Sequence, residues 1–328
     1  MRREETGKHG FDQGDTMNQI KLKEVDRLEI AVLVDNFTDL LMLESSKTVR
    51  RALVMPPARF FAEHGFSLLI KTIADGKEYS TLLDTGGSTD CLFHNVELLK
   101  IDFNNIQSVV LSHGHFDHFG GLIGFLKAYG KDKTVYVHPD VFLERRLNLP
   151  GAPDPIDMFR LDESALISTK ATIRKTKGAT TLAAETILLS GEIERTTDFE
   201  KGFPLAQAKI DNQWIVDPFY DDQALGIHVK NRGLVVIGGC SHAGIINTIT
   251  HLQKKTGIET VHAVLGGFHL TGAIFEPIIQ PTIEAMKELN PQFVFPMHCT
   301  GWTAIKRFSE EMKDQFTLTT VGTTYLFQ

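Results

Sequence analysis

The chain has 328 residues, 42% of them hydrophobic, which is enough to bury the core of one large domain or of two ordinary ones. Its net charge of −7 and its scattered basic residues argue against nucleic acid as a partner, because phosphate-backbone binding needs clustered positive charge. The three cysteines form no CxxC pair and are odd in number. They indicate a reducing compartment, so we expect a cytoplasmic protein.

The first 24 residues are polar and charged and lack the apolar core of a signal peptide. We interpret residues 1–24 as an N-terminal extension and residues 25–328 as one folded domain. No later apolar run reaches the length of a membrane span. We therefore expect no membrane partner.

The first third of the chain is predicted to form an antiparallel or mixed sheet. One β-rich apolar run, LEIAVLVDNF, begins at Leu28, and a second covers Phe66 to Ile73. The dipeptide Asp75-Gly76 then separates this second run from YSTLLDTGG. Two apolar runs around such a dipeptide are typical of a β-hairpin.

Helices and strands alternate from residue 91 onward. CLFHNVELLKI and DHFGGLIGFLKAYG have helical spacing, whereas SVVLSH and TVYVHP are short apolar strands. Residues 140–220 are less regular, with β-rich runs at TILLSGEI and QWIVDPF. The last third has strands at GLVVIGGCSH, VHAVLGGFHL and FVFPMHCTG, and helices at residues 245–255 and 283–289. In open α/β sheets, sites form beyond the C-terminal ends of the strands.

A cluster of metal-ligand residues directly follows one of these strands. The segment SHGHFDH contains His113, His115, Asp117 and His118. In an extended segment His113 and His115 point to the same side, and Asp117 and His118 fall in the first turn of the next helix. Nitrogen and oxygen donors without a thiolate suit Zn²⁺, and also Fe or Mn, in a catalytic site. Desolvating three imidazoles together is costly without an ion to coordinate.

Three more histidines occupy matching places in the last third of the chain. His242, His269 and His298 each follow an apolar strand. A single histidine in such a place is commonly a hydrogen-bonded core or loop residue. Their recurrence after successive strands makes them candidates for the same metal site.

The segment SHGHFDH resembles the HxHxDH signature of the metallo-β-lactamase superfamily. LLDTGG before it and GGCSH and PMHCTG after it occur in the order that this superfamily uses. The resemblance spans about Leu28 to the C-terminus. It implies an α/β (α+β) fold, a four-layer αββα sandwich of two mixed sheets flanked by helices, with one or two metal ions at one edge.

The resemblance also implies which residues hold the ions. His113, His115 and His242 would bind the first metal, and Asp117, His118 and His298 the second. Asp84, in LLDTGG, would orient a ligand histidine from outside the coordination sphere; a polar residue in a strand-to-helix turn is the alternative. Zn²⁺ is the favoured ion, with Mn, Fe or Mg as alternatives.

The sequence departs from the family pattern at one position. Many dinuclear members carry a bridging aspartate at the end of the penultimate strand, whereas VHAVLGGFHL has no acid there. Either His269 acts as a ligand or substrate contact, or the second metal is held weakly, or the site has one ion. Cys240 and Cys299 lie next to two of the ligand histidines in sequence, and we predict that neither binds metal.

Secondary motifs favour one branch of the superfamily. VDN at Val34, AEHGFSLLI at Ala62, GGCSHAGIINTI at Gly238, GGFHL and HCTG are together similar to the group around 7,8-dihydropterin-6-methyl-4-(β-D-ribofuranosyl)-aminobenzene-5′-phosphate synthase. That activity displaces pyrophosphate at a pterin methyl carbon. The substrate would be a small molecule, a pterin or another phosphorylated compound.

Two other functions stay open from the residues alone. One is a metal-dependent hydrolase of a small phosphoester, ester or lactone, in which a metal-bound water attacks. The other is a non-catalytic protein that binds a metal or a small molecule. In an enzyme, Asp117 or His269 would handle the proton. A nuclease is disfavoured by the acidic charge balance.

Residues that would bind the substrate are less specific in sequence. Asp35, Asn36 and His64 are candidates for hydrogen bonds to a pterin edge, and His269 for a further contact; turn and cap roles are the alternative. Arg145 in the irregular middle segment is a candidate for a phosphate, although solvated surface charge is the better interpretation. Since both halves supply metal ligands, we predict a single catalytic domain. A homodimer is compatible with such a fold, but no motif specifies one.

Overall fold

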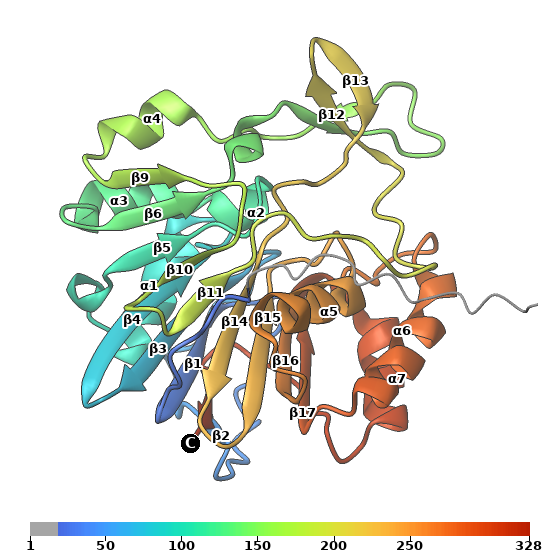
Figure 1. The fold of residues 1–328 in the computed structure, drawn as a ribbon. Helices are drawn as coiled ribbons and strands as arrows, with labels where there is room; N and C mark the ends of the chain where they lie inside the picture. The colour runs from blue at the N-terminus through green and yellow to red at the C-terminus, as the bar shows by residue number, and fades with distance from the viewer. Residues whose placement is uncertain (1–18) are drawn as a thin grey trace, which may run out of the picture.

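The computed structural model describes residues 19–328, and most of its strands belong to two large sheets (Figure 1). In spatial order, the first sheet consists of β2 (Val49–Arg51), β18 (Thr323–Phe327), β1 (Arg27–Val34), β3 (Ser67–Ala74), β4 (Lys77–Leu83), β5 (Ser108–Val110), β6 (Thr134–Val137) and β9 (Thr172–Lys175). The second consists of β10 (Thr180–Leu182), β11 (Ile187–Leu189), β14 (Ala224–Val229), β15 (Gly233–Gly238), β16 (Val261–Gly267) and β17 (Phe293–Met297).

The helices and a small third sheet complete the fold. The small sheet has the order β13 (Gln213–Val216), β12 (Ala206–Ile210), β7 (Arg145–Leu147) and β8 (Ile156–Asp157). The α-helices are α1 (Thr89–Leu99), α2 (Phe116–Phe119), α3 (Leu122–Tyr129), α4 (Glu163–Ser168), α5 (Ile245–Thr256), α6 (Glu276–Leu289) and α7 (Trp302–Glu311). Three 3₁₀ turns cover Phe103–Asn105, Pro139–Phe142 and His298–Thr300.

Three clusters of buried apolar side chains define four layers. The central cluster lies between the two sheets and contains Ile30 and Leu68 of the first and Val235 and Leu265 of the second. A second cluster joins the outer face of the second sheet to α5, α6 and α7, which Figure 1 shows along one side of that sheet. A third joins the first sheet to α1 and α3. The predicted αββα sandwich is therefore confirmed.

Both sheets are mixed, and their parallel parts bring strand ends to one edge. β4, β5 and β6 pair in parallel in the first sheet, and β15, β16 and β17 do so in the second. Helical connections such as α1, α5 and α6 link these strands, as parallel pairing requires. β15 is buried at every position, as is typical of a strand covered on both faces. The residues that follow these strands share one rim of the sandwich.

The structure differs from the predicted elements in several places. Helix α7 and strand β18 were not predicted from the pattern; β18 pairs with β1 and β2 in the first sheet. Helix α6 begins at Glu276, earlier than the predicted start at residue 283, and contains Pro281. The predicted helix over residues 117–130 is divided into α2 and α3 at Gly120 and Gly121.

The predicted N-terminal extension falls mostly outside the described residues, since it covers residues 1–24 and the structure describes the chain from residue 19. Residues 19–24 lie on the second sheet. The Ile20 amide donates to the Lys255 carbonyl, the Lys23 amide donates to the Glu185 carbonyl, and Leu22 is buried. Among residues 19–328, no helix has the length and apolar content to cross a bilayer.

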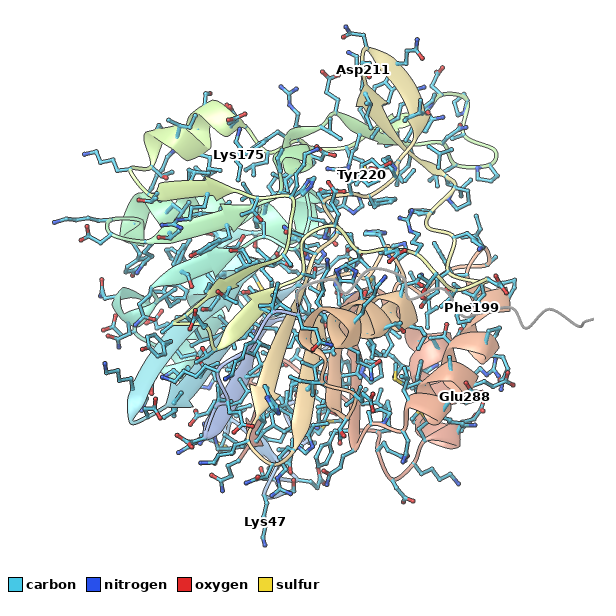
Figure 2. All side chains as sticks on the ribbon, viewed as in Figure 1. Lys47, Lys175, Phe199, Asp211, Tyr220 and Glu288 are labelled. Atoms are coloured by element: carbon cyan, nitrogen blue, oxygen red, sulfur yellow. The ribbon has the colours of Figure 1, made fainter. Side chains whose placement is uncertain are left out.

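A buried ion-pair network connects the small sheet to the rim. Arg145 of β7 donates to Asp217 through Nε and to Asp221 through a terminal nitrogen, at 2.7 Å each. Asp221 also accepts the backbone amide of Gly114 at 2.8 Å. Figure 2 shows Asp211 at the tip of the β12–β13 hairpin and Tyr220 closer to the sandwich. The expectation that Arg145 is solvated surface charge is wrong, because its side chain is only 3% exposed.

We predict that Asp221→Ala destabilises the protein by about 3–5 kcal/mol, because it leaves the Arg145 charge and the Gly114 amide buried with one partner fewer. Denaturant unfolding at pH 7 measures this change. Glu310→Ala is the matched control, since Glu310 forms an exposed ion pair with Lys306 on α7 and its loss is expected to change stability by less than about 1 kcal/mol. Equal effects of the two substitutions would contradict the prediction.

We also predict that His262 makes the protein less stable in acid. His262 of β16 is buried against Phe293 and Phe327, and burial lowers its pKa to about 4. Because the unfolded pKa is about 6.5, its contribution to stability is complete above that pH. It is lost as the pH falls from about 6.5 toward 4, at up to about 1.4 kcal/mol per pH unit. His262→Phe should therefore flatten the dependence of unfolding free energy on pH in this window; an unchanged slope would refute this role.

Candidate metal centre

The candidate metal centre lies where strands of both sheets end at the common rim. Each of five strands is followed within a few residues by a polar side chain with a ring nitrogen or a carboxylate. In strand order β4, β5, β15, β16 and β17, these side chains are Asp84, His113, His242, His269 and His298. The rim therefore combines donors from the first half of the chain with donors from the second.

The HxHxDH segment has the local structure that its sequence predicts. His113 and His115 lie in the loop after β5, and His115 is the N-cap residue of α2. Asp117 and His118 fall in the only turn of this short helix, and all four side chains are buried. The loop offers these four groups to one small volume.

The first group of donors consists of His113, His115 and His242. The ring centroid of His113 lies 4.5 Å from that of His115 and 4.8 Å from that of His242. The ring centroids of His115 and His242 are also 4.8 Å apart. The ring of Phe219 stacks on His242 with a centroid distance of 4.2 Å and an interplanar angle of 7°. These distances bring together the three residues predicted for the first ion.

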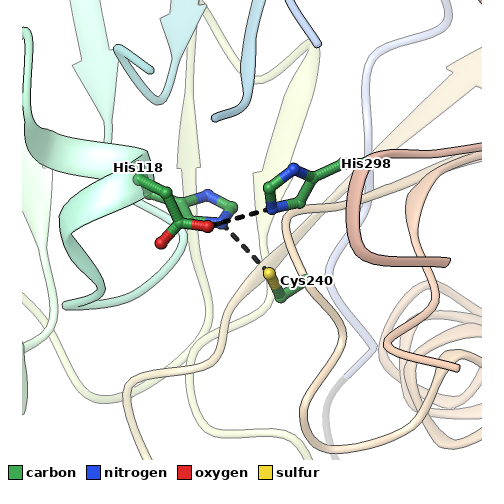
Figure 3. Close-up of side chains that lie close together, drawn as sticks. His118, Cys240 and His298 are labelled. Carbon is green, nitrogen blue, oxygen red and sulfur yellow. Dashed lines mark hydrogen bonds and ion pairs between the residues drawn. The ribbon is translucent and has the colours of Figure 1, made fainter. Parts of the chain in front are cut away.

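The second group of donors contains Asp117, His118 and His298. Asp117 Oδ2 lies 3.2 Å from Nε2 of His298 and 3.7 Å from Nε2 of His118. Cys240 Sγ is also present, 3.1 Å from Nε2 of His118. Figure 3 shows His118, Cys240 and His298 directed toward one another. The four donor atoms lie within 4.8 Å of one another.

Two ligand histidines are oriented by acceptors behind them. Asp84 Oδ2 accepts the Nδ1 proton of His118 at 2.6 Å, and Asn36 Oδ1 accepts that of His298 at 3.0 Å. Each contact holds a proton on Nδ1 and so directs Nε2 at the other donors. Acceptors of this kind are common behind metal-bound histidines. Asp35 Oδ1 also accepts a hydrogen bond from the backbone amide of His298, at 2.9 Å.

The hydrogen bonding of the donor atoms is what a metal site requires. Nε2 of His113, His115 and His242 is buried and has no hydrogen-bond partner among the described residues. Burial lowers the pKa of His113, His115 and His242 well below the usual value, so these rings are neutral. A neutral imidazole is the form that coordinates a metal.

Asp117 and His298 form an ion pair in the metal-free chain. Burial alone would raise the pKa of Asp117, but the neighbouring His118 and His298 hold it well below its usual range. Burial likewise opposes the charged form of His298, but Cys299, Asp117 and Asp35 together raise its pKa to about 9. A divalent ion would take the place of this proton, because metal binding to histidine releases protons.

The predicted substrate-binding residues lie on both sides of His298. His64 Nε2 is 3.3 Å from Asp117 Oδ2, and the His64 side chain is 60% exposed. Asp35 and Asn36 contact His298 and also line a cavity of about 210 Å³ together with the aromatic side chains of Phe37 and Trp302. Burial raises the pKa of Asp35 to about 6.

His269 borders the first donor group rather than the second. Its ring centroid lies 4.1 Å from that of His242. The rings of Phe203 and Phe275 pack against it, with centroid distances of 5.2 and 4.7 Å. The ring is partly exposed. This placement leaves His269 accessible to a ligand at the rim.

Several residues of the site were missed from the sequence. They come from the irregular segment before β14, and they are Phe219, Asp221 and Asp222. Asp222 Oδ2 accepts the amide of Ala243, the residue after His242, at 2.8 Å, and burial raises its pKa to about 7. DPFYDDQ carries no motif with a known spacing. Its two adjacent acids before an apolar strand were the only available signal.

Five residues at the rim have a backbone conformation that is strained for their type. Positive φ angles occur at residues other than glycine at Asp84, Phe219, Ser241, His269 and His298, with values of 56°, 51°, 57°, 45° and 51°. Such angles are uncommon for these residue types and persist only where the surrounding structure enforces them. Here they follow strand ends and aim side chains at the donors.

Comparisons with known proteins agree with this geometry. Residues 62–251 match the model of the metallo-β-lactamase superfamily. The chain is 35% identical over 266 residues to the 7,8-dihydropterin-6-methyl-4-(β-D-ribofuranosyl)-aminobenzene-5′-phosphate synthase of Methanocaldococcus jannaschii, covering 78% of this chain and 87% of that protein. It is 30% identical over 254 residues to an uncharacterized protein of the same organism, covering 77% and 90%.

Solved structures give the same result for the fold. Tm1679, a metal-dependent hydrolase of the β-lactamase superfamily, matches 92% of this chain and 98% of its own, with a TM-score of 0.70 and 25% identity. YhfI of Bacillus subtilis, a metallo-β-lactamase fold protein, covers 92% of this chain with a TM-score of 0.50 and 12% identity, which shows the fold alone. The chain is an enzyme that belongs to the metallo-β-lactamase superfamily.

Proposed function

We propose that this protein is a metal-dependent transferase that joins an aromatic amine to a pterin methyl carbon with loss of pyrophosphate. The observation that carries this proposal is the 35% identity to the M. jannaschii synthase over 78% of the chain, combined with a complete set of buried donors. That relative is named for a product in which an aminobenzene is joined to a pterin methyl group. In the step, a nitrogen–carbon bond forms, the carbon–oxygen bond to pyrophosphate breaks, and the amine loses a proton.

The donor groups assign the ions in this proposal. His113, His115 and His242 would hold one ion, and Asp117, His118 and His298 a second, with Zn²⁺ favoured. When bound, such ions neutralise the charge that develops on a departing pyrophosphate. The cytoplasm and a small-molecule substrate belong to the same proposal, and the three buried, unpaired cysteines agree with a reducing compartment.

The chain's own residues would position the two flat substrates. The cavity beside His298 offers the Asp35 carboxylate and the Asn36 amide to hydrogen-bond the edge of a heterocycle, and Phe37 and Trp302 to cover its faces. His64 stands between Asn36 and Asp117, at 3.3 Å from each. A pterin bound there would lie against the second donor group.

The proton of the amine needs an acceptor outside the donor groups. Asp117 was one candidate, but its Oδ2 faces His118 and His298 and would be occupied by an ion. His269 is partly exposed and lies beside His242. We assign the proton to His269, because a general base must not be bound to metal. The amine would then enter over the first donor group, beside His269, and the pterin beside the second.

We predict about one or two equivalents of Zn, Mn or Fe per chain in protein purified without added metal, measured by elemental analysis. His113→Ala and His242→Ala should each lose metal, because each removes a direct ligand. His228→Ala is the control, since His228 lies on β14 beside Glu24 and should retain the metal. A folded wild-type chain that takes up no metal on titration would refute the metal centre.

We predict that His269→Gln lowers kcat for pterin–amine coupling by about 10²–10⁴-fold with metal content unchanged, because it removes the proton acceptor. Mass spectrometry of the coupled product and pyrophosphate release measure the rate, with His228→Gln as control. Unchanged kcat would exclude His269 as the base. Pyrophosphate release without the amine and without a coupled product would instead indicate a hydrolase.

A further inference from the structure

Cys240 occupies a position that is shared by both donor groups. Its sulfur lies close to the donor atoms of Asp117, His118 and His298, the second donor group, and close to those of His113 and His242, two of the three members of the first donor group. Within each of these two sets, Cys240 included, all donor atoms lie within 4.8 Å of one another. No other donor atom belongs to both of these sets among the described residues.

The local structure forces the thiol into this place. Gly239 lies so close to the β5 loop that a Cβ there would stand 2.2 Å from Ser112 Oγ, so only glycine allows this approach. The next residue, Cys240, is 2% exposed, and its thiol donates to Nε2 of His118 at 3.1 Å. Since Asp84 holds the proton of His118 on Nδ1, that Nε2 is an acceptor in the metal-free chain.

We propose that the Cys240 thiolate bridges the two metal positions and stands in for the missing bridging acid. This inference rests on the metal centre of the proposed function. Two ligands of one tetrahedral zinc ion lie about 3.4–3.8 Å apart, given Zn–N of about 2.0–2.1 Å and Zn–S of about 2.3 Å. A sulfur near the donors of both groups can meet this spacing toward each ion.

Charge favours the same assignment. The other donors of the two groups are imidazoles and one carboxylate, that of Asp117. They bring a single negative charge to a buried site that would hold up to two divalent ions. A coordinated thiol is deprotonated, and Cys240 would add a second negative charge at the point between the ions. The prediction from sequence that Cys240 does not bind metal is thus replaced by this proposal.

Cys299 provides a matched control within the same site. It is also buried, and its sulfur lies within 4.8 Å of donor atoms of Cys240 and His269. Its thiol, however, donates to the Cys240 carbonyl at 3.5 Å and packs against Gly267, where a Cβ would stand 2.6 Å from it. Cys299 therefore lies against backbone and beside His269, which is outside the two donor groups, whereas Cys240 lies beside ligands of both groups.

The test is cobalt(II) titration of the metal-free full-length chain, with absorption and dialysis as readouts. A bridging thiolate should give a near-ultraviolet thiolate-to-cobalt charge-transfer band that rises with both the first and the second equivalent. Cys240→Ser should lose the band, and its affinity for the second equivalent should fall by more than the roughly 10–100-fold that loss of an outer-shell partner produces. Cys299→Ser should keep both.

Cys240→Asp separates ligation from folding. A carboxylate at this position should restore two equivalents of cobalt without the charge-transfer band. Two bound equivalents with no band in the wild type, a band that saturates at one equivalent, or loss of the band in Cys299→Ser would each overturn the bridging thiolate while leaving the metal centre intact. Failure of the wild type to bind any cobalt would overturn the metal centre as well.

Discussion

The site depends on burying several neutral imidazoles with their lone pairs directed into one small volume. Nε2 of His113, His115 and His242 lacks a hydrogen-bond partner among the described residues, and a buried polar atom in this condition is costly. Packing in the rest of the sandwich must keep these rings from rotating toward other hydrogen-bond partners. A metal ion would satisfy all of the lone pairs at once.

Four side chains outside the donor groups hold the donors in place. Asp84 and Asn36 fix the rings of His118 and His298 from behind. Asp221 and Asp222 fix the backbone of the two ligand loops through the amides of Gly114 and Ala243. These acceptors come from distant parts of the chain. Precise placement of a ligand therefore requires most of the fold, and not only the loop that carries the ligand.

The sequence predicted the layers and the ligand loops because both follow local rules. Alternating burial in β1 and the spacing of HxHxDH are properties of a few consecutive residues. Strand β18 was missed because its formation depends on pairing with β1, almost 300 residues away in the chain. Arg145 was misjudged for the same reason, since only tertiary structure brings its guanidinium between Asp217 and Asp221. Local patterns carry no information about such partners.

Cys240 shows most clearly where sequence reasoning stops. Cys240 lies two residues before His242 in the sequence, yet packing was the simpler interpretation of a cysteine at a strand end. What decides its environment is the close approach of two loops, one from each sheet, at Gly239 and Ser112. Because that approach joins the two halves of the molecule, the sulfur lies between donors from both. The same contact explains why neither half could form the centre alone: each sheet brings ligands, and the packing between the sheets sets the distance between them.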